Sequence, residues 1–150
     1  MSTYTQILYQ VVFGSKKCAN FLTGTNQEEL FRYIAGILKN KKCFTYIVGG
    51  QANHLHLIFS LHRSVALADV VRDVKKASAE MMYKSKGKFI RFPGWQVGYS
   101  AFTYSLEARE YLIRYVENQQ EHHRRITFRE ELIGFFKDFG VEYNEKYLFV

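Results

Sequence analysis

Apolar and polar residues along the chain follow two periods, one typical of strands and one of helices. Stretches rich in β-branched and aromatic residues predict strands at residues 4–13, 43–48, 53–61 and 100–104. Apolar residues at helical spacing predict helices at residues 27–41, 66–83, 105–122 and 127–140. The predicted order is therefore β-α-β-β-α-β, followed by two more helices.

This order is the ferredoxin-like pattern, an α+β fold. We expect an antiparallel sheet with helices packed on one face, to which a C-terminal helix carrying Tyr115 is added. The 150 residues contain no repeat, low-complexity tract or linker, so one domain spanning residues 1–150 is the simplest organisation. In this arrangement the strand at residues 53–61 is a central one.

Polar residues mark the predicted helix starts. Thr25 or Asn26 can cap the first helix, and the Ser105 hydroxyl can cap the third. Thr127 and Glu130 have the spacing of a capping box, which places the start of the last helix.

Two histidines in the third strand are the main chemical signal. Side chains alternate along a strand, so His54 and His56 share one sheet face, whereas Leu55 and Leu57 point into a core. Imidazoles about 7 Å apart along a strand can converge on one divalent cation. A pair does not complete a coordination sphere, so a third ligand must come from elsewhere. The alternative is a half-exposed strand that carries two histidines without a shared role.

The charge of the chain favours a polyanionic partner. The net charge is +7, and no long apolar run anchors the chain in a membrane, so nucleic acid is the expected partner. Between residues 63 and 91 the chain has eight Lys or Arg but only three acidic residues. From this run Arg72, Lys75 and Lys76 are expected to contact phosphates, the alternative being a solvated basic face. The opening residues do not have the form of a signal peptide, so a cytoplasmic location is expected.

The third predicted helix carries a candidate nucleophile. Tyr115 and Gln119 are four residues apart and share one helix face. Such a tyrosine can be an ordinary core residue, or its phenolate can attack a phosphodiester and stay bonded to DNA. That reaction needs a metal on the phosphate, which His54 and His56 could hold with Gln119 as the third ligand. Tyr111 is a weaker candidate because no glutamine follows four residues later.

The ordered combination of these motifs resembles the small HUH transposases with a single catalytic tyrosine (IS200-like). These are encoded by the shortest bacterial insertion sequences and include relatives that act on repetitive extragenic palindromes. The resemblance runs almost end to end and is carried by Tyr4-Thr-Gln-Ile7, Val12-Phe13, Tyr33-Ile-x-Gly36, Gly49-Gly50, His54-Leu-His-Leu57, Trp95-Gln96, Gly98-Tyr99-x-Ala-Phe102, Tyr115-Val-Glu-Asn-Gln119, Glu121-His-His-Arg124 and Phe128-Arg-Glu-Glu-Leu132.

The resemblance implies a DNA transposase, a metal-dependent single-strand endonuclease and strand transferase. His54, His56 and Gln119 would hold Mg2+ or Mn2+, and Tyr115 would form a 5′-phosphotyrosine link and release a 3′-hydroxyl. Strands are then exchanged without ATP or another nucleotide cofactor. The expected substrate is single-stranded DNA with a hairpin near the element's end. The expected assembly is a homodimer, in which the tyrosine helix can serve the partner's histidines.

Four further residues are candidates for DNA contacts. Phe102 and Tyr104 could stack on unpaired bases, and Arg124 and Arg125 could hold a phosphate unless they form a solvated helix end.

The sequence departs from the family pattern at two positions. Many relatives carry Asp where this chain has Asn53, and Asp again where it has Val97. Both changes remove a carboxylate and weaken any role in supporting a metal ligand or a base there. Two alternatives therefore remain: a decayed or domesticated hairpin-binding protein, and a metal-dependent phosphodiesterase that uses His54 and His56 with water as the nucleophile.

Overall fold

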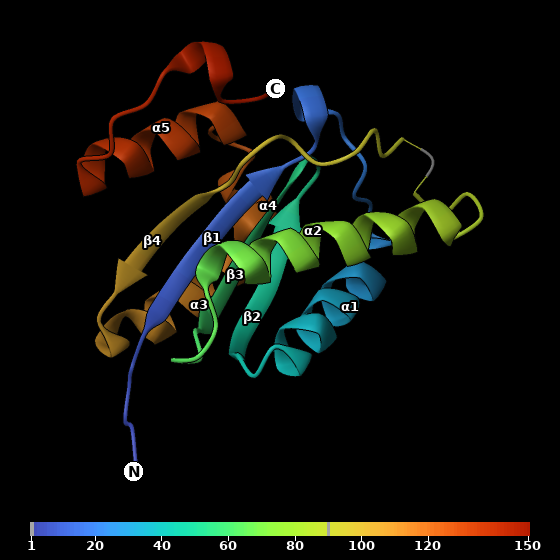
Figure 1. Cartoon of the computed structure of the whole chain (residues 1–150). Helices are drawn as coiled ribbons and strands as arrows, with labels where there is room; N and C mark the ends of the chain where they lie inside the picture. Colours follow the sequence, from blue (N-terminus) through green and yellow to red (C-terminus); the bar gives the residue numbers. More distant parts are fainter. Residues whose placement is uncertain (1, 90) are drawn as a thin grey trace.

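An antiparallel sheet runs through the centre of the molecule (Figure 1). The computed structural model describes residues 2–89 and 91–150. Within them the sheet has four strands in the order β2-β3-β1-β4, and every pairing is antiparallel. The strands are β1 (Leu8–Gly14), β2 (Phe44–Gln51), β3 (His54–Ser60) and β4 (Ser100–Tyr104). The histidine strand β3 is central, as predicted, and the first strand begins at Leu8 instead of residue 4.

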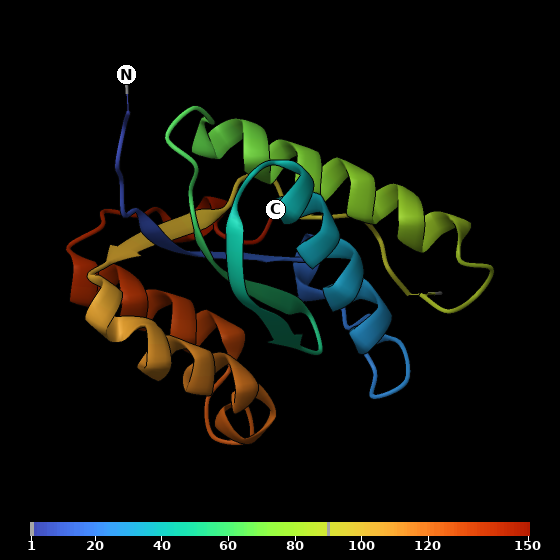
Figure 2. The same cartoon turned by 90° about the horizontal axis from the view of Figure 1, so that it is seen from below.

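Two helices, α1 (Gln27–Asn40) and α2 (Leu67–Lys84), cover one face of the sheet (Figure 2). Their buried residues recur at helical spacing, which gives each helix one apolar side to place against the strands. This layer forms the largest core cluster, to which β3 contributes Leu55, Leu57 and Phe59. The odd-numbered residues of β3 thus point into the core, as the alternation predicted.

A second helical layer lies over the opposite face (Figure 2). It consists of α3 (Arg109–Glu117), α4 (Gln119–His122) and α5 (Phe128–Phe139). Leu112 and Val116 pack on Ile58, and Phe128 packs on the sheet beside Phe102. The predicted α+β fold is confirmed, and α5 joins the tyrosine helix on this second face. The even-numbered side chains of β3, including both histidines, therefore lie between the sheet and these helices.

The predicted helix at residues 105–122 is interrupted. A 3-10 turn, Leu106–Ala108, precedes α3, and Ser105 makes no side-chain capping bond. Asn118 leaves the helical conformation (φ −94°, ψ 17°) and separates α3 from α4. Tyr115 and Gln119 consequently belong to two helical segments whose directions are set separately.

The remaining helix starts agree with the predictions in part. Thr127 and Glu130 form the predicted capping box, and α5 ends at Gly140, which has the left-handed conformation (φ 65°) that glycine tolerates. Asn26 occupies the N-cap of α1 without capping it. Its side-chain oxygen accepts instead from the Thr23 N–H, at 2.8 Å. None of the described helices combines the length and apolar character that a membrane span requires.

Candidate active site

The two histidines of β3 are fully covered. His54 is 1% exposed and His56 0%, and their ring centroids are 5.2 Å apart. The alternative of a half-exposed strand is therefore wrong. Burying two imidazoles is unfavourable unless their nitrogens find partners, so the contacts of each ring nitrogen define the site.

One nitrogen of each ring is held by an amide oxygen. His54 Nδ1 lies 2.9 Å from Asn53 Oδ1, and His56 Nδ1 lies 2.8 Å from Gln10 Oε1. The Asn53 amide nitrogen donates to the Cys18 carbonyl at 3.2 Å, which turns its oxygen toward His54. Because an amide oxygen only accepts, Nδ1 carries the hydrogen in both rings. The Nε2 lone pairs then point into the space between sheet and helices.

Gln119, the first residue of α4, and His123, which directly follows α4, close this space. The Gln119 side chain is buried, and its Oε1 lies 3.0 Å from His54 Nε2 and 3.1 Å from His123 Nε2. The Nδ1 of His123 donates to the Ile126 carbonyl, at 2.9 Å, so this third ring also presents an Nε2 lone pair. Gln119 reaches the histidine pair as predicted, whereas the part played by His123 was not predicted.

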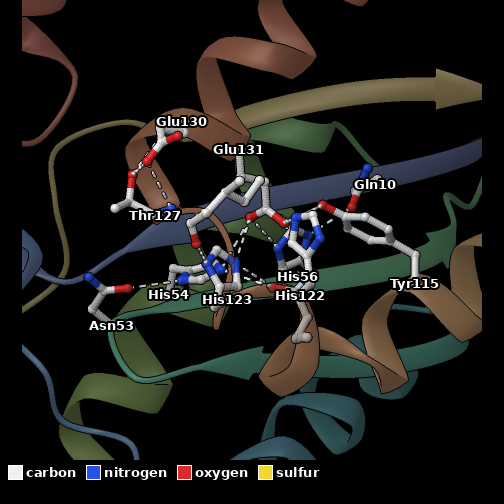
Figure 3. A network of polar contacts seen from close by, with 12 residues as sticks. Gln10, Asn53, His54, His56, Tyr115, His122, His123, Thr127, Glu130 and Glu131 are labelled. Atoms are coloured by element: carbon white, nitrogen blue, oxygen red, sulfur yellow. Dashed lines mark hydrogen bonds and ion pairs between the residues drawn. The ribbon is translucent and has the colours of Figure 1, made fainter.

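A buried carboxylate on α5, that of Glu131, lies at the centre of the cluster (Figure 3). Its Oε1 is 3.1 Å from His56 Nε2, 3.3 Å from His54 Nε2 and 3.2 Å from His123 Nε2. The sequence analysis missed this residue. Its signal is an acidic residue in the apolar stripe of a helix, between Phe128 and Leu132.

The electrostatics of the cluster favour a cation. Burial lowers the pKa of His54 to about 4, against a smaller opposing effect of the nearby Glu131 carboxylate, so this ring is neutral at pH 7. Burial alone would raise the pKa of Glu131, but its contacts with His56, His123 and His54 hold that pKa well below its usual range. A carboxylate and inward-facing imidazole lone pairs are stabilised together by a divalent cation.

The donor set fits such an ion. Ligand atoms of His54, His123 and Glu131 lie within 4.8 Å of one another. His56 Nε2 and Gln119 Oε1 face the same carboxylate and histidines. Imidazole, amide and carboxylate donors are ligands that first-row divalent metals accept. These residues could therefore hold a metal.

Tyr115 meets the histidines of its own chain. Its ring centroid lies 5.8 Å from that of His56. Its hydroxyl donates to Glu131 Oε2 and lies 3.1 Å from His122 Nε2 (Figure 3). Burial, together with the negative charge of Glu131, raises the pKa of Tyr115 well above its usual value. The phenol is therefore protonated here and must lose its proton before it can act as a nucleophile.

Two glycines let the covering helices approach. Gly14 of β1 pairs with His54, and Gly49 of β2 pairs with His56. A Cβ on Gly49 would lie 2.5 Å from Val116 Cγ1 of α3, and one on Gly14 would lie 2.8 Å from Phe128 Cε2 of α5. Both distances are far below van der Waals contact. The absence of side chains at these positions thus sets how closely α3 and α5 sit on the histidines.

Arginine side chains line two hollows beside the cluster. One, of about 310 Å³, adjoins His54 and includes Arg124 and Arg125. The other, of about 620 Å³, adjoins Tyr115 and includes Arg114 and again Arg125. The two predicted arginines thus lie next to the histidine and tyrosine groups.

Other predicted DNA contacts are not brought to this site. Arg72, Lys75 and Lys76 belong to α2, on the opposite face of the sheet. Lys75 Nζ donates to the Gln96 carbonyl at 2.9 Å and to that of Gly98. Any DNA contact by these three residues stays a prediction.

The structure also locates Phe102 and Tyr104, the two aromatic candidates for base stacking, and Val97, the second departure from the family pattern. Phe102 is 4% exposed and packs in the cluster under α5. The Tyr104 hydroxyl accepts from the Gln10 amide at 2.7 Å, which links it to the support of His56. Val97 is 72% exposed, so no carboxylate is missing from a buried contact at that position.

Comparison with known proteins identifies the family. A sequence profile described as "Transposase IS200 like" matches residues 3–119, well over half of the chain. The chain belongs to the IS200-like transposase family. Membership implies an enzyme that cleaves DNA, and DNA as its partner. His122, His123 and Glu131 follow the matched residues, so part of the cluster is built by the C-terminal segment.

Two solved structures share the fold of this transposase. A Deinococcus radiodurans R1 protein described as a transposase has a TM-score of 0.64 at 20% identity, covering 79% of this chain and 95% of that one. A REP-associated tyrosine transposase bound to a REP hairpin has a TM-score of 0.58 at 15% identity, covering 82% of this chain and 74% of that one. At these identities the likeness supports the fold alone. No curated protein matches the chain.

Proposed function

We propose that this transposase cuts and rejoins single-stranded DNA at hairpin-bearing ends through a 5′-phosphotyrosine link to Tyr115, with Mg2+ or Mn2+ as the metal. One observation carries the proposal. His56 of β3 and the pair Tyr115 and Gln119, about 60 residues later in the sequence, all contact the carboxylate of the buried Glu131. A tyrosine placed only for packing would not need a hydroxyl in this position.

The metal would be held by His54, His56 and Gln119, with His123 and Glu131 placed to complete the ligand set. When bound, it supplies positive charge that polarises the scissile phosphate. Asn53 and Gln10 keep the two imidazoles in the form that presents Nε2.

The cleavage step replaces one bond to phosphorus by another. The Tyr115 oxygen forms a bond to the phosphorus, the bond from phosphorus to the 3′-oxygen breaks, and a 3′-hydroxyl leaves. A second 3′-hydroxyl reverses the step on the phosphotyrosine, so strands are rejoined without an external energy source. Arg125 lines both hollows, which supports a role for its guanidinium in holding backbone phosphates near the reacting one.

The hairpin and the homodimer are also part of the proposal. The second structural neighbour is bound to a REP hairpin, and this chain shares its fold and carries a net charge of +7. The homodimer remains a prediction. Because Tyr115 contacts the cluster of its own chain, we propose that each subunit uses its own nucleophile.

The test is a denaturing gel of the protein mixed with single-stranded oligonucleotides that carry the hairpin of its own element, with and without Mn2+. We expect a metal-dependent covalent band that is lost in Tyr115→Phe and retained in Tyr111→Phe, since Tyr111 is 64% exposed. Native-gel binding without a covalent band would indicate a decayed hairpin-binding protein. Cleavage that persists in Tyr115→Phe would indicate water as the nucleophile.

A further inference from the structure

The two oxygens of Glu131 face two different chemical groups. Oε1 faces the imidazoles of His54, His56 and His123. Oε2 accepts the hydroxyl of Tyr115 and also lies 3.2 Å from the Nε2 of the partly exposed His122. The Gln119 amide nitrogen donates to the same Oε2 at 3.1 Å, which fixes the orientation of the carboxylate.

We propose that Glu131 is a catalytic residue that accepts the Tyr115 proton during DNA cleavage. This inference rests on the proposed function. As the Tyr115 oxygen bonds to phosphorus, its hydrogen moves to Glu131 Oε2, and the departing 3′-oxygen takes a proton from water. In the rejoining step the attacking 3′-hydroxyl gives its proton to water, and the protonated carboxylate returns its hydrogen to the departing tyrosine oxygen, so both directions use the same contact.

The position of Glu131 suits this transfer. The acceptor must lie within hydrogen-bond reach of the proton that it removes, and the Tyr115 hydroxyl already points to Oε2. The carboxylate is 4% exposed, and in the part of the chain that the structure describes its partners are imidazole, phenol and amide groups, with no lysine or arginine among them. A lysine or arginine partner would compete for the lone pairs of Oε2 that accept the proton.

One other group reaches the same hydroxyl. His122 Nε2 lies 3.1 Å from the Tyr115 oxygen, and the His122 side chain is 31% exposed. In this arrangement the His122 ring can donate to the tyrosine oxygen after the proton has left. His122 is therefore a positioning residue in this proposal, and the experiment must separate it from Glu131.

The first variant to compare is Glu131→Gln, which keeps the shape of the side chain but removes the proton acceptor. We expect the rate of covalent adduct formation to fall about 10²- to 10⁴-fold, the usual contribution of a general base. Glu130→Gln is the matched control, because Glu130 is the exposed preceding residue and glutamine still serves its capping box. Thermal unfolding and Mn2+ titration of each variant report folding and metal affinity separately from the reaction.

The deciding measurement replaces Tyr115 by difluorotyrosine, whose more acidic phenol ionises without a base. In Glu131→Gln, with Mn2+ at saturation, this replacement should restore most of the lost adduct rate. In the His122→Gln variant it should restore little. A Glu131 that served only as a metal ligand or as packing would leave the double variant as slow as Glu131→Gln alone.

The outcomes separate the two proposals. An unmodified protein that forms no Tyr115 adduct overturns the proposed function. An adduct that forms at the same rate in Glu131→Gln, or a rescue confined to His122→Gln, overturns the role of Glu131 and leaves the proposed function standing.

Discussion

His54 and Phe128 stack face to face, with ring centroids 4.1 Å apart and planes within 5° of parallel. Phe128 is the first residue of α5 and is 5% exposed. The contact that seats the helix carrying Glu131 is thus also the contact that fixes the plane of His54. Folding and orientation of a candidate metal ligand depend on the same side chain.

Removing this ring should therefore affect both properties. We expect Phe128→Ala to lower the free energy of unfolding by about 3–5 kcal/mol, the range for truncating a buried phenylalanine, as measured by urea denaturation. Mn2+ affinity, measured by calorimetry, should fall as well. Phe139→Ala at the other end of α5 is the control, since Phe139 is 41% exposed and should cost less. Equal losses of unfolding free energy and of Mn2+ affinity in Phe128→Ala and Phe139→Ala would contradict this account.

Gln10 should control the metal affinity through His56. Gln10→Met keeps the length of the side chain but removes the oxygen that accepts from His56 Nδ1. Partners that orient histidine ligands usually contribute about 10–100-fold to metal affinity, and we expect a loss in that range in a Mn2+ titration. Gln120→Met, at an exposed position on α4, is the comparison. An unchanged affinity in Gln10→Met would show that the ring needs no such support.

Arg125 should contribute to the electrostatic part of DNA binding. Because it lines both hollows, Arg125→Ala should weaken binding to single-stranded DNA of any sequence. The slope of log affinity against log salt should shrink by about 0.7, the value for one phosphate contact on a single strand. Fluorescence anisotropy at several salt concentrations measures this slope. Arg129→Ala, whose partner is Glu145, should leave the slope unchanged.

Subunit mixing should show which chain supplies the tyrosine. If Tyr115 serves the histidines of its own subunit, Tyr115→Phe mixed with His56→Ala forms no intact site, because each chain has lost one half. We expect no covalent adduct after the two proteins have been allowed to exchange subunits. Recovery of an adduct would mean that the tyrosine crosses to the partner, which restores one complete site per mixed dimer.

The stability of the protein should depend on Lys75 at alkaline pH. Burial lowers the pKa of Lys75 to about 8 from its ordinary value of 10.5. Between these pH values the unfolded chain binds more protons than the folded one, so the free energy of unfolding should rise with pH. The penalty for the buried charge is fully present below pH 8.

The measurement for Lys75 is urea denaturation at about pH 7.5 and pH 10, since one value lies below the pKa of the folded state and the other near that of the unfolded state. Relative to Lys75→Met, the unmodified protein should gain stability at the higher pH. Lys76→Met removes the same charge from an exposed neighbouring position. If the unmodified protein gains as much stability relative to Lys76→Met as it does relative to Lys75→Met, the effect is not specific to Lys75.

Most of the fold was predictable because its signals are local. Alternation along β3 placed both histidines on one face, and the Thr127 capping box marked the start of α5. The break at Asn118 had no comparable signal, since residues 109–122 keep helical spacing on both sides of it. How α3 and α4 are directed depends on their packing against β2, which a one-dimensional pattern does not contain.

The candidate site was predictable only where it follows the family pattern. Tyr115, Gln119, His54 and His56 lie together within one chain, whereas the resemblance allowed Tyr115 to serve the partner's histidines; their roles in catalysis and metal binding stay predictions. Glu131 was missed because acidic side chains are ordinarily exposed, even when they fall within the apolar stripe of a helix. Only the fold shows that this one is buried. The Lys75 prediction came from charge alone, which could not show that its ammonium group also donates to the carbonyls of Gln96 and Gly98.

The glycines that pair with the two histidines have a consequence for how this site can change over generations. Phe128 and Val116 occupy the space that side chains at Gly14 and Gly49 would take. The distance between the sheet and the covering helices therefore depends on the absence of a Cβ at these two positions. Adding even one methyl group at either position would lift a helix and carry Glu131 or Tyr115 away from the histidines. The strands can therefore accept few substitutions here, although neither glycine takes part in the chemistry.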